Sequence, residues 1–565
     1  MQVVTPKQMA KIEEQSEKLG VSKKELMRNA GRKLADIIED TAKRIKGGQP
    51  KDTAVVFLAG SGNNGGDCFT SANILAYRDY NVTVVNLCGK PSTELAEEAF
   101  GKMSADLIRT VTGYRNENVK SAIEAAELDY MTLSDENSIS DVQDKKELSP
   151  VEQILINEKE RLSEVRKAVM SADILVDGVF GTGFHGQLNK DICYIFSIST
   201  KAYKIAVDVP SGGDSGKGNV SEGIFKADET VALGYIKAGL LQYPLRRYCG
   251  KITVTDIGIP DSAVDVISGE RTYIRIERNH LQGFPIARRR DSHKGDFGKV
   301  LVIAGSSSMR GAAAFAVLGA LRTGAGLVTL ASVEKCIDTV SVLAPEATFI
   351  EMECDDRGFM LFDYNKDEIL KAMEKSTAIV IGCGMGVTND TIELTKFVSE
   401  NAKCPVIIDA DGINCIANNI DILLNKNSEV IITPHPGEMS VLLSCDTRLV
   451  NENRIVTAEK YAEKYGITVV LKGAATLVAN SNVTASNHTG NAGMSKGGSG
   501  DILAGIIGAI AGQGYSPVYS CCAGVYIHGL AGDAAAEKFG QEAMLPRDTL
   551  DCIPDAFRIL KEKNK

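Results

Sequence analysis

The sequence predicts an α/β protein of two domains, and three observations support this. The chain has 565 residues, more than one hydrophobic core usually serves. Short apolar runs followed by glycines recur along both halves, a pattern typical of buried parallel strands that lead through a loop into a helix. The pattern is interrupted near residues 260–290 by Pro260, Pro285 and the basic run Arg288–Arg290. We therefore expect an N-terminal domain over residues 1–265 and a C-terminal domain over 275–565.

Composition excludes several classes of function. The net charge of −10, the absence of tryptophan and an aromatic content of 6% argue against a nucleic-acid-binding face. The thirteen cysteines show no CxxC pair, which favours reduced thiols over disulfides or a zinc site. Residues 1–7 have no apolar signal region, and Arg322 interrupts the longest apolar run. We therefore expect a cytoplasmic protein without a membrane partner.

The first half begins with two amphipathic helices over residues 7–46, the second preceded by Ser22 with Glu25 three positions later. A buried strand at 53–59 then leads into the glycine loop 60–67 and a helix, and a second strand follows at 82–87. Residues 110–165 are acidic and polar, with a charged helix at 151–169. We interpret this segment as a surface insertion and assign it no chemistry.

Polar side chains follow three strands of this half. Asn63, Asn64 and Asp67 follow the first, Asp177 ends the second, and Asp208 and Ser211 follow the third. If the strands are parallel, their carboxyl ends meet at one crevice of the sheet. Oxygen-rich loops of this kind suit a hard cation or sugar hydroxyls. The alternative, three unrelated capped turns, would leave these carboxylates without a purpose.

The second half repeats the pattern of strand, glycines and helix, with strands near 299–304, 378–381, 405–409, 430–433 and 468–471. Its last loop, Gly490–Asp501, holds five glycines and precedes an apolar helix at 502–510. Such a loop directs backbone N–H groups towards an anion at the helix N-terminus. Asp501 at the junction would either cap the helix or act as a base beside a bound phosphate.

The motifs of the second half resemble those of the ribokinase-like superfamily, and most closely those of NAD(P)H-hydrate dehydratases. The residues that carry this resemblance are His293–Asp296, Gly324–Val328, Asp409–Asp411, Thr433–Glu438, Leu471–Gly473 and Gly497–Asp501. The first half resembles NAD(P)H-hydrate epimerases through Asn63–Asp67, Asp177 with Phe180–Gly183, and Asp208–Gly212. The order of the two halves resembles that of bifunctional NAD(P)H-hydrate repair enzymes. The resemblance implies a Rossmann-like α/β/α domain followed by a ribokinase-like α/β domain.

The resemblance implies that the first domain interconverts the R and S epimers of NADHX and NADPHX, cofactors hydrated at C6 of the nicotinamide ring. It assigns K+ to Asn64, Asp177 and Ser211. We expect either Asp177 or Asp208 to be the proton-transfer group. The implied substrate-binding residues are Asn63, Asn64, Gly65, Gly66, Asp67, Gly181, Thr182, Gly183, Phe184, His185, Gly186, Gln187 and Asp208.

For the second domain the resemblance implies dehydration of the S epimer with ADP or ATP and Mg2+. Asp501 would be the base, and Ala312, Gly386, His435 and Asp501 would face the hydrated nicotinamide. The implied nucleotide-binding residues are Lys472, Gly473, Ala474, Ala475, Thr476, Gly497, Gly498, Ser499 and Gly500. The alternative is a ribokinase-like kinase of a vitamin alcohol, fused to a non-catalytic nucleotide-binding module. Small molecules are the expected partners, and we expect a homo-oligomer.

Overall fold

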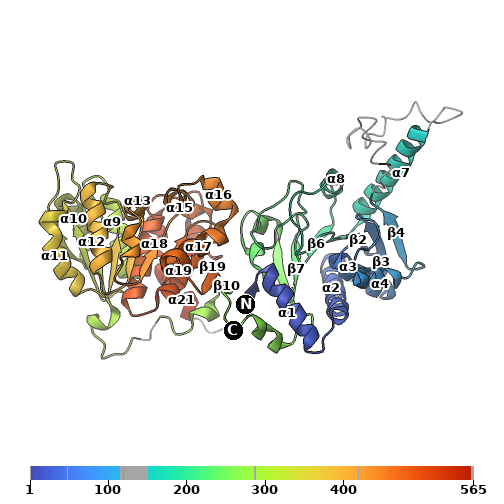
Figure 1. Ribbon diagram of the computed structural model, residues 1–565, viewed down its shortest axis with the longest axis horizontal. Coiled ribbons are helices and arrows are strands. Elements are labelled where there is room, and N and C mark those ends of the chain that lie inside the picture. The colour runs from blue at the N-terminus through green and yellow to red at the C-terminus, as the bar shows by residue number, and fades with distance from the viewer. Residues whose placement is uncertain are drawn as a thin grey trace. The chain divides into compact units, whose positions relative to one another are not determined.

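The computed structural model describes residues 2–47, 49–114, 119, 150–285, 288–417 and 419–561. The chain forms two compact units, Gln2–Glu270 and Arg271–Lys565 (Figure 1). The division falls inside the interval 265–275 between the two domains expected from the sequence. Among the described residues, no helix combines the length and apolar character needed to cross a membrane.

The N-terminal unit is built on a parallel sheet of order β4-β3-β2-β5-β6-β7-β9. A short parallel pair, β1 with β8, belongs to the same unit. The strands are β1 (Gln2–Val4), β2 (Ala54–Ala59), β3 (Asn81–Asn86), β4 (Ile108–Thr112), β5 (Ile174–Gly178), β6 (Tyr203–Val207), β7 (Glu229–Leu233), β8 (Ile236–Lys237) and β9 (Lys251–Thr255). Strands β2, β5 and β6 are neighbours, so the three polar strand ends singled out in the sequence lie side by side.

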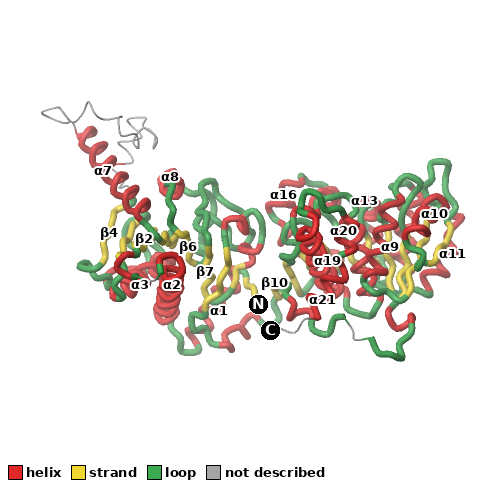
Figure 2. The backbone as a smooth tube through the Cα atoms, turned by 180° about the vertical axis from the view of Figure 1, so that it is seen from behind, coloured by secondary structure: helices red, strands yellow, loops and turns green. Residues whose placement is uncertain are grey.

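Helices cover both faces of this sheet and give the predicted three-layer arrangement (Figure 2). Alternate residues of β2 explain the layers, because successive side chains point to opposite faces. Val55 and Phe57 pack with α2 and α3, whereas Val56 and Leu58 pack with α7 and α8. The helices are α1 (Pro6–Lys18), α2 (Lys23–Lys46), α3 (Asn63–Tyr77), α4 (Glu94–Gly101), α7 (Pro150–Ser171) and α8 (Lys190–Ser197).

The insertion predicted over residues 110–165 is narrower than expected. Its first residues belong to β4, which pairs with β3. Its last residues belong to α7, whose Leu162 and Val165 are buried against the sheet. Residues 115–118 and 120–149, which carry most of its acidic sequence, lie outside the described residues. The helix predicted at 151–169 is thus present as α7, whereas strand β4 and the burial of one face of α7 were not predicted, because half of each element is polar and faces solvent.

The C-terminal unit contains a mostly parallel sheet of order β13-β12-β11-β14-β15-β16-β17-β18-β19-β10, in which β17, β18 and β19 are antiparallel neighbours. The strands are β10 (Thr272–Arg275), β11 (Lys299–Ile303), β12 (Leu327–Ser332), β13 (Thr348–Glu351), β14 (Ala378–Ile381), β15 (Val406–Ile408), β16 (Val430–Ile432), β17 (Thr468–Leu471), β18 (Leu477–Ala479) and β19 (Val483–Ser486). The parallel strands β14 to β17 bring their carboxyl ends to one edge.

The glycine-rich helix α18 (Ser499–Gly512) packs closely against α9 (Arg310–Arg322). A Cβ atom at Gly505 of α18 would lie 2.1 Å from the backbone oxygen of Ala316 in α9, so only glycine allows this approach. The helices are α9 (Arg310–Arg322), α10 (Glu334–Leu343), α11 (Phe362–Glu374), α12 (Asn389–Asn401), α13 (Asp411–Ala417), α14 (Asp421–Leu424), α15 (Pro436–Leu443), α16 (Thr447–Glu452), α17 (Arg454–Tyr465), α18 (Ser499–Gly512), α19 (Pro517–Phe539), α20 (Pro546–Asp551) and α21 (Ile553–Lys561).

Candidate functional sites

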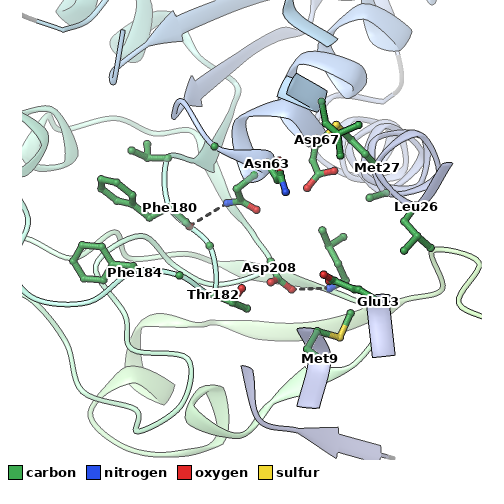
Figure 3. A pocket seen from close by; sticks show the side chains of 18 of the residues that line it. Met9, Glu13, Leu26, Met27, Asn63, Asp67, Phe180, Thr182, Phe184 and Asp208 are labelled. Carbon is green, nitrogen blue, oxygen red and sulfur yellow. Dashed lines mark hydrogen bonds between the residues drawn. The ribbon is translucent and has the colours of Figure 1, made fainter. Parts of the chain in front are cut away.

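A cavity of about 700 Å³ opens at the carboxyl ends of β2, β5 and β6 in the N-terminal unit (Figure 3). The size suits a cofactor-sized ligand. The sequence-predicted residues that line it are Asn63, Asn64, Asp67, Gly181, Thr182, Gly183, Phe184, His185, Gln187 and Asp208. The convergence expected from three parallel strand ends is therefore present.

Other predicted residues of this half are close to the cavity without lining it. Gly65 lies against the backbone of Gly60, where a Cβ atom would be 2.1 Å from the carbonyl oxygen. Gly66 lies against Met27, with a Cβ atom 2.6 Å from the methyl carbon. Both glycines thus permit the close start of α3, and Gly186 provides a turn with a φ of 97°. Neither Asp177 nor Ser211 is part of the lining.

Asp177, at the end of β5, is fully buried. Its carboxylate accepts hydrogen bonds from Ser211 N at 2.8 Å, Ser211 Oγ at 2.6 Å and Val179 N at 3.2 Å. Burial raises the pKa of Asp177 to about 6, although these three hydrogen bonds favour the charged form. In the described part of the chain no cationic side chain pairs with it. A bound cation would supply the missing positive charge.

The three residues assigned to K+ are linked through the backbone of Phe180 and the hydroxyl of Ser211. Asn64 donates from its side-chain amide to Phe180 O at 3.0 Å, and Phe180 N donates to Ser211 Oγ at 2.8 Å. Ser211 in turn bonds Asp177. A carboxylate, a hydroxyl and an amide in one buried place are the oxygen-bearing groups that a hard cation prefers. The residues present therefore fit such an ion.

Asp208 points into the cavity from the end of β6. Its backbone has a φ of 64°, a left-handed conformation that is uncommon outside glycine. Its carboxylate accepts hydrogen bonds from Leu233 N at 3.0 Å and from the ammonium group of Lys237. The side chain of Lys237 is only 1% exposed. A strained backbone held by a buried ion pair fixes the orientation of this carboxylate.

Several cavity residues were missed in the sequence. Glu13 on α1 and Lys237 on β8 both line it, as do Met9, Leu26, Met27 and Ile257. Lys237 had a detectable signal, because it is the one charged residue in the otherwise apolar and glycine-rich stretch Leu233–Leu241. Glu13 had none, because a glutamate on an amphipathic helix is usually solvated.

In the C-terminal unit a buried ion pair links the ends of β15 and β17. Lys472 Nζ lies 2.7 Å from Asp409 Oδ1 and 3.7 Å from Glu438 Oε2. Thr433 also donates to Asp409 Oδ1, at 2.7 Å. Burial alone would lower the pKa of Lys472, but the two carboxylates outweigh it and the pKa is raised. Lys472 is therefore a fixed positive charge at this edge of the sheet.

Asp501 lies beside this pair, in the first turn of α18. It does not cap the helix: the N-cap is Gly498, with a φ of 104°, and Asp501 is the third helical residue. Facing atoms of Cys383, Asp409 and Asp501 lie within 4.8 Å of one another. Burial, and next the nearby Asp409, raise the pKa of Asp501 to about 6. A carboxyl group with this pKa can accept a proton near neutral pH.

His435 and Glu438 extend the polar chain from Lys472. His435 caps α15, since Glu438 N donates to His435 Nδ1 at 3.1 Å and His435 N donates to Glu438 Oε2 at 2.7 Å. The imidazole itself is exposed. Burial raises the pKa of Glu438, against the attraction of Lys472. The result is a continuous set of polar contacts from an exposed imidazole to the buried pair.

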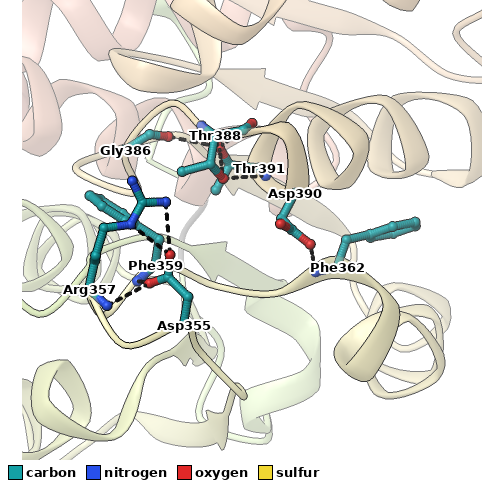
Figure 4. Close-up of polar contacts among 8 residues, drawn as sticks. All are labelled: Asp355, Arg357, Phe359, Phe362, Gly386, Thr388, Asp390 and Thr391. Atoms are coloured by element: carbon teal, nitrogen blue, oxygen red, sulfur yellow. Dashed lines mark hydrogen bonds and ion pairs between the residues drawn. The ribbon is translucent and has the colours of Figure 1, made fainter.

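Gly386, predicted to face the substrate, belongs to the loop after β14 (Figure 4). Its N–H donates to Asp411 Oδ2 at 2.9 Å, and its carbonyl accepts from Thr391 Oγ1 at 3.0 Å. Phe359 packs directly on it, because a Cβ atom at Gly386 would lie 2.3 Å from the Phe359 ring. The Phe359 ring is covered by Arg357, which is ion-paired with Asp355. Gly386 is thus buried, with both of its backbone polar groups hydrogen-bonded.

The remaining predicted residues surround the start of α18. Ala312 on α9 packs near the same loop, since a Cβ atom at Gly384 would lie 2.9 Å from it. Gly500 lies over the ion pair, with a Cβ position 3.2 Å from Lys472 Nζ. The turn Lys472–Thr476 follows β17, and Ala475 within it has a φ of 57°. Gly473, Ala474 and Gly497 are exposed. Backbone N–H groups, one ammonium and one carboxyl therefore meet at a solvent-accessible helix N-terminus.

Comparison with known proteins gives matches to both units. A family model described as NAD(P)H-hydrate dehydratase matches residues 300–555, and one described as the N-terminus of YjeF-related proteins matches residues 23–239. The bifunctional NAD(P)H-hydrate repair enzyme of Moorella thermoacetica is 31% identical over 548 residues, covering 95% of this chain and 93% of its own. That of Thermofilum pendens is 30% identical over 552 residues, covering 97% and 94%.

Among solved structures, an ADP/ATP-dependent NAD(P)H-hydrate dehydratase from Bacillus subtilis, co-crystallised with ATP and Mg2+, is 27% identical with a TM-score of 0.44. It covers 51% of this chain and 99% of its own. The fold and sites define a protein of two α/β units, the second of which matches the NAD(P)H-hydrate dehydratase family model. The chain belongs to the family of bifunctional NAD(P)H-hydrate repair enzymes.

Proposed function

We propose that this protein repairs hydrated nicotinamide cofactors in two steps. The N-terminal unit would interconvert R- and S-NAD(P)HX, and the C-terminal unit would dehydrate S-NAD(P)HX with ADP or ATP and Mg2+. Family membership over nearly the whole chain supports both steps. The observation that carries the proposal is the placement of Asp501 beside Lys472 and Asp409, at the glycine-rich start of α18.

Dehydration requires activation of a poor leaving group. Asp501 would remove the proton of the C6 hydroxyl as that oxygen attacks the terminal phosphoryl group of the nucleotide. The N–H groups of Gly497, Gly498, Ser499 and Gly500 would stabilise the charge on the transferred phosphoryl. Loss of inorganic phosphate from C6 and of a proton from C5 would then restore the double bond of the reduced nicotinamide.

The loops after the strands of the C-terminal unit support a proposal for where the ligands bind. The turn Lys472–Thr476 and Gly500 would bind the nucleotide, with Mg2+ supplying charge neutralisation between its phosphates. Ala312, Gly386 and His435 would face the hydrated nicotinamide. Lys472 would hold the phosphates through its ammonium group while remaining paired with Asp409.

For the epimerase we propose Asp208, rather than Asp177, as the proton-transfer group. Asp208 lines the cavity, whereas Asp177 is hydrogen-bonded to Ser211 and is not part of the lining. Asn64, Asp177 and Ser211 would hold K+, whose charge would fix the loop of Phe180 beside the substrate. The backbone and side chains of the lining residues, from Asn63 to Asp67 and Gly181 to Gln187, would position the cofactor.

One experiment tests both steps. Mixed NADHX epimers are incubated with the protein and ADP or ATP, and the absorbance of the reduced nicotinamide is followed with product analysis by mass spectrometry. We expect complete conversion to NADH with release of phosphate. Accumulation of a phosphorylated substrate without NADH would instead support the small-molecule kinase. Conversion that stops when the S epimer is used up would contradict the epimerase step. The homo-oligomeric state and cytoplasmic location stay predictions.

A further inference from the structure

The epimerase cavity holds two carboxyl groups beside the Asp208–Lys237 ion pair, and they come from distant parts of the chain. Glu13 lies on α1 and Asp67 on α3, while Asp208 follows β6 and Lys237 ends β8. Figure 3 shows the carboxyl groups of Glu13, Asp67 and Asp208 directed into the same part of the cavity. One ammonium group therefore faces three carboxyl groups.

The carboxyl groups differ in their partners. Asp208 accepts hydrogen bonds from Lys237 and from Leu233 N. Within the described residues, neither Glu13 nor Asp67 has a hydrogen bond or an ion pair through its carboxyl group. Asp67 is nevertheless only 7% exposed. A buried carboxyl group without a partner is stable in its protonated form, and the exposed face it offers is the cavity.

The electrostatic surroundings agree with this division. Burial raises the pKa of Asp67 well above its usual range, the charges of Asp208 and Glu13 add to the effect, and Lys237 opposes it. Burial also raises the pKa of Glu13, against the attraction of Lys237 and of Lys23 on α2. A protonated carboxyl group thus faces a carboxylate held by an ammonium group. Two carboxyl groups whose surroundings favour opposite protonation states can supply the acid and the base of a reaction.

We propose that Asp67 is the proton donor and Asp208 the proton acceptor of the epimer exchange, with Lys237 and Glu13 as positioning residues. Lys237 holds Asp208 as a carboxylate, and Glu13 keeps the proton on Asp67. The inference rests on the proposed epimerase activity of this unit. It adds Lys237 and Glu13 to the site and gives Asp67 a chemical role beyond substrate binding.

The reaction needs both groups because C6 carries the hydroxyl and the ring nitrogen N1. Asp208 takes the hydroxyl proton, the C6–O bond becomes a carbonyl, and the C6–N1 bond breaks with its electron pair moving to N1. Asp67 gives its proton to N1. Rotation about C5–C6 then presents the other face of the aldehyde to N1. As the ring closes, the proton on N1 returns to Asp67, and Asp208 gives its proton to the oxygen of the new hydroxyl. The sequence is redox-neutral.

The test uses the full chain and measures each unit separately. Epimer exchange is followed from the pure R epimer by NMR or chromatography without nucleotide, from pH 5 to 9, with uncatalysed exchange subtracted. Asp67→Asn is expected to lower kcat at least 100-fold, which is within the range for loss of a general acid. The residual activity should lose the decline at high pH. Glu13→Gln should shift that decline to lower pH. Lys237→Met should lower kcat, because Asp208 loses the ammonium group that orients its carboxylate.

Matched controls separate chemistry from folding. Glu14→Gln and Lys24→Met change neighbouring surface residues that are ion-paired with Lys18 and Glu98. Both should retain the wild-type exchange rate and pH profile. Dehydration of the pure S epimer by the C-terminal unit should be unchanged in every variant. Because Asp67 and Glu13 have no partner to lose, their variants remain informative even if Lys237→Met prevents folding.

The outcomes distinguish this inference from the function on which it rests. Absence of exchange in the wild type would overturn the epimerase assignment itself. Exchange in the wild type with unchanged rates and pH profiles in Asp67→Asn and Glu13→Gln would overturn the acid and base roles while leaving the epimerase in place. Equal losses at all pH values, without a shift of either limb, would reduce these residues to a structural role and would also contradict the proposal.

Discussion

Removal of the buried ammonium group in the C-terminal unit should be strongly destabilising. In Lys472→Met, Asp409 and Glu438 lose the cation that lies 2.7 Å and 3.7 Å from their oxygens. At an effective dielectric constant of about 20, two charges this close attract by about 6 kcal/mol. Part of that attraction offsets the desolvation of the ions, so the expected loss of stability is about 3–5 kcal/mol at pH 8.

The loss of folding stability caused by Lys472→Met should be smaller at low pH. Lys472 is charged in the folded and the unfolded state between pH 5 and 8, so its own titration contributes nothing in this window. The carboxyl groups of Glu438 and Asp501 have raised pKa values, the latter about 6, and they take up protons as the pH falls. A neutral carboxyl group no longer needs the ammonium group. We therefore expect a clearly smaller effect of Lys472→Met at pH 5 than at pH 8.

The assay is urea unfolding followed by hydrogen-exchange mass spectrometry, which reports on each unit separately. Peptides from β11 and β16 follow the C-terminal unit, and peptides from β2 serve as the internal reference. Lys371→Met is the matched control, because Lys371 is 67% exposed in its pair with Glu368 and should change stability by less than about 0.5 kcal/mol. A loss below 1 kcal/mol at pH 8, or an equal loss at both pH values, would refute the reasoning.

Three further predictions concern single residues. The kcat of dehydration should fall about tenfold per pH unit below pH 6, because Asp501 must be ionised to act as a base, and Asp501→Asn should lower kcat by a factor of about 10²–10⁴. The absorbance of the reduced nicotinamide measures both effects. A kcat that does not change with pH would exclude Asp501 as the base. Compared with choline chloride at equal ionic strength, KCl should raise the melting temperature of the N-terminal unit above pH 6, where Asp177 is ionised, and should raise it less at pH 5. Asp177→Asn should abolish this stabilisation. If K+ still stabilises this variant, the ion binds elsewhere. Gly505→Ala should destabilise the C-terminal unit by about 2 kcal/mol through a clash with Ala316 O. Gly311→Ala on α9, where a Cβ atom meets open space, should be neutral or slightly stabilising in the same denaturation assay. Equal effects of the two substitutions would contradict the packing described.

The sheets and their loops could be predicted because their signals are local. The buried runs before Gly60, Asp177 and Asp208 are continuous and apolar, as parallel strands require, and β2, β5 and β6 are indeed adjacent. From that adjacency a shared crevice follows directly. In the segment 110–165 the helix at 151–169 was predicted, but strand β4 and the buried face of α7 were not, because each element also exposes a polar face.

The finer parts of the sites depend on contacts between distant residues. Sequence alone could not decide whether Asp177 or Asp208 transfers the proton, because both end a strand before a glycine loop. In the structure Asp177 is buried and hydrogen-bonded to Ser211, whereas Asp208, with a φ of 64°, faces the cavity. Glu13 could not be told from its neighbour Glu14 until the docking of α1 was known. Likewise, the cap of α18 depends on the left-handed conformation of Gly498, which a run of glycines does not specify.

The span of the epimerase cavity has a consequence for synthesis of the chain. Its lining runs from Met9 to Ile257, and β1, at the start of the unit, pairs with β8, which carries Lys237. A nascent chain that has emerged only as far as Asp208 therefore lacks the counter-ion of that carboxylate. The cavity can close only when nearly the entire N-terminal unit has left the ribosome, at the pace of translation. Translational pausing before residue 240 should leave α1 undocked and open to proteolysis, while pausing beyond residue 300 should not.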